Sequence, residues 1–178
     1  MTATYRYAKR AGVLLGQFLE DATSGIAAAC GRVNTDREDS LLPTTWTFAN
    51  HGKGRVVALP IVRYVYLGDE SDEPMRRGNQ PAWYSFNLVL AVGAGNVGGD
   101  GFAPGTDEDV AESLAWALRE MFLETKLYHG HTLGGRVRSA KLTALASPGP
   151  VQIEQLNNAR AIVVGAYVRI GMSELRET

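Results

Sequence analysis

The chain has 178 residues, of which 45% are hydrophobic and 21% are charged, a balance typical of an ordinary globular protein. Its formal net charge is −1, so no overall field draws it to nucleic acid or to an acidic membrane surface. A chain of this length is expected to fold as a single domain over residues 1–178.

The sequence contains one cysteine, Cys30, which excludes an internal disulfide and a paired-thiol zinc motif. This cysteine usage fits a reducing cytosol. The first ten residues lack the apolar core of a secretion signal, and no stretch is long enough in apolar residues to cross a bilayer.

Residues 5–30 are predicted to be helical because apolar residues recur every three or four positions and line one face. These residues are Ala11, Leu15, Phe18, Ala22 and Ile26. Gly25 lies inside the pattern and predicts a break or a second short helix, whereas Gly31 is expected to stop the helix. A long polar loop over about 31–55 should follow.

Two strands, over 55–67 and 82–92, are predicted to form an antiparallel hairpin with an extended tip. Both faces of the first strand are apolar, and Pro60 predicts an edge position or a bulge because proline has no backbone N–H. In the second, Tyr84 and every other residue to Val92 should point inward. The connecting loop, 68–81, carries candidate assembly charges: Asp69, Glu70, Arg76 and Arg77.

The second helix is predicted over 106–127, with Thr106 as N-cap and acidic residues in the first turn. One apolar stripe contains Val110, Ala111, Leu114, Leu118, Met121 and Phe122. Trp116, Leu123 and Leu127 fall on nearly the opposite face. This second face is expected to cover either a neighbouring subunit or the N-terminal helix of the same chain.

Two further strands are predicted over 136–146 and 160–172, and alternate residues from Ile162 to Ile170 should point into the core. The order is therefore α-β-β-α-β-β. The predicted fold class is α+β, with a mainly antiparallel sheet of four strands or slightly more and two principal helices packed on it. Its long loops are expected at about 31–55, 68–81 and 93–105.

Three features could carry chemistry, but none forms a convincing catalytic or binding site. The segment Gly93–Gly101 contains a literal dinucleotide fingerprint, yet the next helix begins well downstream of those glycines. His129 and His131 could face a metal, but no carboxylate or thiol near them in sequence completes a site. Arg136, Arg138 and Lys141 form a small basic patch that suits salt bridges to acidic loops of the same or a neighbouring subunit at least as well as it suits nucleic acid. We therefore expect no catalytic residue, no cofactor and no metal.

The succession of elements resembles the tail terminator, or tail completion, proteins of long-tailed bacteriophages, the family typified by the phage lambda tail terminator. The resemblance runs from the N-terminal helix to the last strand. The pieces that carry it most clearly are residues 56–61 with 83–88, the helix start Thr106-Asp107-Glu108-Asp109 and the closing strand Ala161-Ile162-Val163-Val164. Loops 32–53 and 68–81 are longer than those of the shorter family members.

The resemblance implies a structural virion protein and not an enzyme. Such a protein forms a hexameric ring that caps the tail tube, ends its polymerisation and joins the tail to the head connector. The implied partners are other copies of the chain, the tail tube protein and the head–tail connector protein, with DNA passing through the ring without sequence recognition. The implied location is the tail or neck of the virion, after assembly in the host cytoplasm.

Two alternatives remain open from the sequence. The first is another phage neck or head–tail joining protein. The second belongs to a different class: a small ligand-binding domain or enzyme that uses the Gly93–Gly101 loop or His129 and His131.

Overall fold

The computed structural model describes residues 3–50, 58–70, 83–94, 106–123, 130–146, 150–153 and 159–172. Its helices are α1 (Ala3–Leu19), α2 (Ile26–Arg37), α3 (Asp107–Met121) and a short 3-10 helix, η1 (Gly130–Thr132). Its strands are β1 (Thr47–Asn50), β2 (Ile61–Glu70), β3 (Trp83–Gly93), β4 (Ser139–Ala146), β5 (Pro150–Ile153) and β6 (Ala159–Gly171). None of the described helices combines the length and apolar character needed to cross a membrane.

The strands form one mixed sheet of six strands. Five of them lie in the order β1-β2-β3-β6-β4, and β5 also pairs with β6. The pairing of β1 with β2 is parallel, whereas the remaining pairs are antiparallel. Because β3 occupies one edge of β6 from Ala161 to Gly171, β4 and β5 share the other edge. The fold is thus α+β, as predicted.

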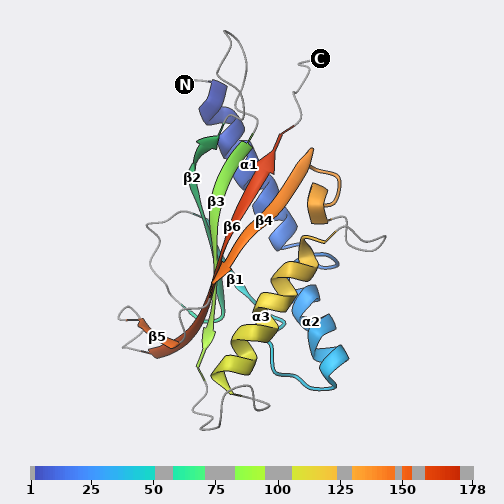
Figure 1. Ribbon diagram of the computed structural model, residues 1–178, viewed down its shortest axis with the longest axis vertical. Helices are drawn as coiled ribbons and strands as arrows, with labels where there is room; N and C mark the ends of the chain where they lie inside the picture. The colour runs from blue at the N-terminus through green and yellow to red at the C-terminus, as the bar shows by residue number, and fades with distance from the viewer. Residues whose placement is uncertain are drawn as a thin grey trace.

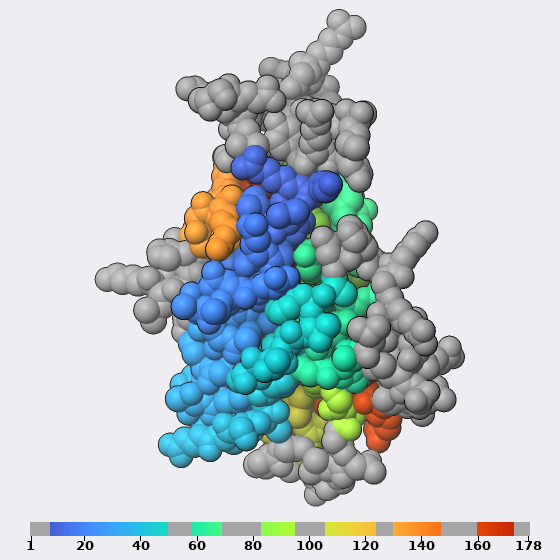
Figure 2. Space-filling view, turned by 180° about the vertical axis from the view of Figure 1, so that it is seen from behind, coloured from blue at the N-terminus to red at the C-terminus, as the bar shows by residue number. Residues whose placement is uncertain are grey.

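The helices cover one face of this sheet (Figure 1), and the view from behind shows α1 above α2 on that covered side (Figure 2). Helix α1 comes close to the sheet because it presents glycines to aromatic rings. A Cβ at Gly12 would lie 3.3 Å from the Phe86 ring, and one at Gly16 would overlap the Tyr64 hydroxyl. Helix α3 packs between β6 and α2. The main core therefore lies between the sheet and the helices.

The segment predicted as the N-terminal helix forms two helices, α1 and α2. This agrees with the break or second short helix predicted from Gly25. The chain turns at Asp21, whose carboxylate accepts hydrogen bonds from the backbone N–H groups of Thr23 and Ser24 and from the Thr23 hydroxyl. The expected stop at Gly31 is wrong, because α2 continues to Arg37. It ends where Glu38 adopts a left-handed conformation, with φ of 58°.

The sheet has six strands, where four or slightly more were predicted, and three α-helices stand in place of the two principal helices expected. Strand β1 lies inside the expected 31–55 loop, and β5 lies between the last two predicted strands. The edge position predicted from Pro60 is wrong because β1 pairs alongside β2. Proline is tolerated there since it precedes Ile61, where β2 begins. A register shift does occur, but between Tyr66 and Gly68.

The β2–β3 hairpin and the alternation of the two central strands are confirmed. Tyr84, Phe86, Leu88, Leu90 and Val92 are buried along β3, and so are Ile162, Val164, Ala166, Val168 and Ile170 along β6. Strand β4 starts at Ser139, three residues later than predicted. Alternation therefore identified the inner face of the sheet where the strands are long.

Candidate functional site

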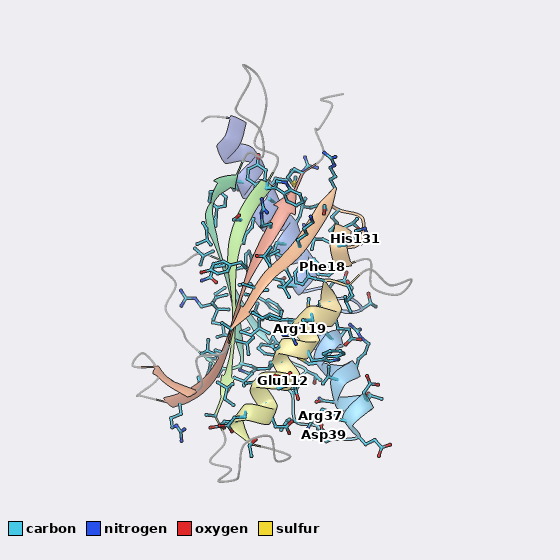
Figure 3. The ribbon with its side chains drawn as sticks, viewed as in Figure 1. Phe18, Arg37, Asp39, Glu112, Arg119 and His131 are labelled. Carbon is cyan, nitrogen blue, oxygen red and sulfur yellow. The ribbon has the colours of Figure 1, made fainter. Side chains whose placement is uncertain are left out.

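The outward side of α3 presents apolar side chains to solvent. We call the exposed residues along it, including the turn that follows the helix, the α3 outer stripe: Glu108, Glu112, Trp116, Arg119 and Leu123. Trp116 is 54% exposed and Leu123 is 51% exposed, so neither packs on α1 in the way that one sequence-based alternative required. Figure 3 shows Glu112 and Arg119 along this helix. Leu127, the third residue predicted for this surface, lies outside the described residues.

Side-chain contacts hold the beginning of α3 in a fixed position. The Thr106 hydroxyl accepts a hydrogen bond from the Asp109 backbone N–H at 3.2 Å, which confirms the predicted N-cap. The Asp109 carboxylate accepts two bonds from the Arg37 guanidinium, at 2.8 and 2.6 Å. These bonds to Asp109 are the main reason that the pKa of Arg37 is raised. The pair formed by Arg37 and Asp109 therefore ties the end of α2 to the start of α3. Arg37 also bonds Asp39 at 3.0 Å, and Figure 3 labels both of these residues.

The other end of α3 is fixed by a close approach of two backbone segments. The Gly130 N–H donates to the Leu123 carbonyl at 3.3 Å, and a Cβ at position 130 would overlap the Met121 carbonyl oxygen. The rings of Phe18 and Phe122 pack edge-on, with centroids 5.8 Å apart. With both ends fixed, α3 presents its outer stripe on a rigid support.

A second exposed surface is part of the sheet face that points away from the helices, here called the open sheet face; the rest of that face, at Ile61, Ala91 and Ala161, is buried in a small apolar cluster. Strand alternation places on it Arg63 and Val65 of β2, Trp83 and Asn87 of β3, Gly165, Tyr167 and Arg169 of β6, and Lys141, Ala144 and Ala146 of β4. Tyr167 is 49% exposed near its centre. The cationic groups of Lys141 and Arg169 each lie 5.2 Å from the Trp83 ring centroid.

The sequence predicted this face only in part. The alternation along β6 placed Tyr167 and Arg169 away from the core, but it did not single them out as functional residues. Neither could it show that Lys141 would lie beside Arg169, because that contact depends on the pairing of β4 with β6. The periodicity identifies an outward side chain, whereas the register identifies its neighbours.

Most of the remaining predicted candidates are not brought together. His131 lies in η1 (Figure 3), and His129 falls outside the described residues. In the Gly93–Gly101 loop only Gly93 and Ala94 are described, as the end of β3 and the residue after it. Asp69 and Glu70 belong to the end of β2, while Arg76 and Arg77 lie outside the described ranges. Within those ranges, no group of three or more His, Cys, Asp or Glu side chains is placed to hold a metal ion.

The predicted basic patch is divided between separate contacts. The Arg136 guanidinium pairs with the Asp21 carboxylate at 3.3 Å, which joins η1 and β4 to the turn between α1 and α2. The Arg138 backbone N–H bonds the Gly171 carbonyl. Lys141, in contrast, joins the open sheet face. The expectation of salt bridging within the chain is therefore confirmed for Arg136.

Cys30 is fully buried beside Trp46, and burial raises the pKa of its thiol to about 12. The reactive form of a cysteine is the thiolate, which a buried apolar position disfavours. Cys30 is therefore a small residue of the core.

Neither a scan of protein-family models nor a search of curated proteins finds a match for this chain.

Proposed function

We propose that this chain is a structural subunit of a bacteriophage tail or neck, which assembles into a ring that caps the tail tube. In this role it ends polymerisation of the tube and joins the tail to the head connector. Six copies would form the ring, DNA would pass through it without sequence recognition, and no reaction would be catalysed. The protein would assemble in the host cytoplasm and remain in the virion.

The observation that carries this proposal is the exposure of Trp116 and Leu123 on a helix whose two ends are fixed. Large apolar side chains gain about 25 cal/mol per Å² when they leave water. A ring subunit removes such side chains from water by contact with its neighbours. The order of elements, with the β2–β3 hairpin, α3 and the closing strand β6, provides independent support through the family resemblance.

The test is electron microscopy of the purified protein alone and mixed with polymerising tail tube protein from the same phage. The proposal expects closed rings, and tubes that stop growing and carry a ring at one end. Tubes that elongate equally with and without the protein would contradict the capping role. A ring found between tail and head, but not on the tube end, would instead identify another head–tail joining protein.

A further inference from the structure

The two exposed surfaces of this chain differ in charge. The α3 outer stripe carries two carboxylates, Glu108 and Glu112, and one cation, Arg119, around the exposed indole of Trp116. The open sheet face, by contrast, presents three cations around Trp83 and Tyr167: Arg63, Lys141 and Arg169. An acidic apolar helix face and a basic aromatic sheet face are complementary in charge.

The open sheet face also has room for a large side chain beside Tyr167. Its neighbours there are Gly165, Ala144 and Ala146, which project little or nothing above the sheet. A Cβ at Gly165 would approach only the Ala146 carbonyl oxygen, at 3.8 Å. A helix that brings a tryptophan to this position can therefore lie close to the sheet.

The spacings of the two surfaces agree. Glu112 precedes Trp116 by four residues, which is about 6 Å along a helix. Arg169 follows Tyr167 by two residues, which is about 6.8 Å along a strand. Lys141 stands opposite Arg169 in the register of β4 and β6. When Trp116 of one copy lies against Tyr167 of another, Glu112 thus reaches the Lys141–Arg169 pair.

We propose that the α3 outer stripe of one copy docks on the open sheet face of a second copy. Because the two surfaces are different, the contact is head-to-tail, and its repetition closes a ring or extends a filament. This inference rests on the proposed function, since it names the surfaces that would form the ring. In the docked contact, Glu112 pairs with Lys141 and Arg169, whose cationic groups lie beside the Trp83 ring of their own copy.

A charge exchange between two variants tests this contact. The first variant is Glu112→Lys, and the second is Lys141→Glu with Arg169→Glu. Each alone should weaken self-association by about tenfold or more, because it places like charges opposite one another. An equimolar mixture should recover assembly, since each variant then finds either a native partner surface or an exchanged one. The measurement is mass in solution by analytical ultracentrifugation, with melting temperature as the control for folding.

Two further variants keep the test independent of folding effects. Ala144→Glu adds a carboxylate to the open sheet face on β4, the strand that carries Lys141, and leaves the Trp83 contacts unaltered. It should therefore weaken self-association as the Lys141→Glu and Arg169→Glu variant does. Lys9→Glu reverses an exposed charge on α1 and should leave assembly unchanged.

The outcomes separate this contact from the wider proposal. If oligomers persist both in the double variant Lys141→Glu with Arg169→Glu and in Ala144→Glu, the open sheet face is not the contact surface. The proposal that the chain forms a ring would then still hold, through another surface. A chain that carries both Glu112→Lys and Arg119→Glu is the last variant. If it self-associates as wild type does, α3 of one copy pairs with α3 of another, and the inference is overturned. A wild-type chain that never self-associates would overturn it too, and the capping experiment would then decide the proposed function separately.

Discussion

Gly130 is required by its surroundings and not by local flexibility. A Cβ at this position would overlap the Met121 carbonyl oxygen, so Gly130→Ala must shift the backbone at the end of α3. We expect the free energy of unfolding to fall by about 1–3 kcal/mol, the range of overpacking in a closed site. Urea unfolding measures this loss.

Gly93 provides the matched control. It ends β3, and a Cβ added there would have no neighbour within 4 Å, so Gly93→Ala should change the free energy of unfolding by less than about 0.5 kcal/mol. Equal losses in the two variants would show that the close approach at Gly130 is not what the stability depends on.

Asp21 should make stability depend on pH. Hydrogen bonds from Thr23, first from its hydroxyl and then from its backbone N–H, hold the pKa of this carboxyl far below its ordinary value. A lowered pKa stabilises the folded state above the ordinary value of about 3.9, and this stabilisation is lost as the pH falls below it. Asp21→Asn should therefore cost on the order of 1 kcal/mol at pH 6, and its deficit should shrink toward pH 3.

The measurement is the free energy of unfolding of both proteins across that range. Asp36→Asn, at an exposed carboxylate of α2, is the control and should alter the profile little. A deficit for Asp21→Asn that stays constant with pH would show that the turn depends on the shape of the side chain and not on its charge.

At the level of elements, the pair formed by Arg37 and Asp109 joins α2 to α3. Both side chains are partly shielded, with side-chain exposures of 26% and 12%, and the pairing is bidentate. A double-mutant cycle with Arg37→Ala and Asp109→Asn should give a coupling of about 1–2 kcal/mol. The cycle is needed because Asp109→Asn alone also removes a charge that favours the start of α3.

Asp39→Asn serves as the comparison within the same network. Its carboxylate bonds Arg37 but is 36% exposed, so its loss should cost under about 0.5 kcal/mol. A coupling near zero between Arg37 and Asp109 would mean that apolar packing alone sets the position of α2 against α3.

Elements with a strong local signal could be predicted from the sequence, and those that depend on partners could not. Strand β3 alternates from Trp83 to Leu90, and α3 begins with a capping threonine and three acidic residues. Strands β1 and β5 have four residues each, too few for alternation to show, and they exist because β2 and β6 offer them edges. Helix α2 passes through Gly31 since Ala29, Cys30 and Val33 pack in the core and outweigh the helix propensity of one glycine.

For the whole molecule, the sequence located one of the two candidate surfaces. Helical periodicity alone placed Trp116 and Leu123 on a second face of α3, and it left their partner undecided. The open sheet face was not predictable in the same way, because Lys141, Trp83 and Arg169 come from three strands and meet only through the sheet register. A surface assembled from distant segments has no local signature in the chain.

The exposed residues of α3 give a test of what they contribute to the monomer. Because Trp116 and Leu123 are each more than half exposed, changing both to serine should leave the cooperative unfolding of the monomer within about 1 kcal/mol of wild type. The same change should abolish self-association, since large aromatic side chains dominate the energy of most interfaces. Denaturant unfolding measures the first effect, and sedimentation at several protein concentrations measures the second.

Val13 supplies the matched control for this variant. It is 43% exposed on α1, away from both proposed surfaces, so Val13→Ser should leave both unfolding and self-association near wild type. If the double variant unfolds without cooperativity, Trp116 and Leu123 belong to the core of a single chain and the ring loses its main support. If it unfolds normally and still assembles, the copies meet through a surface other than α3, and the exposed tryptophan needs a different explanation.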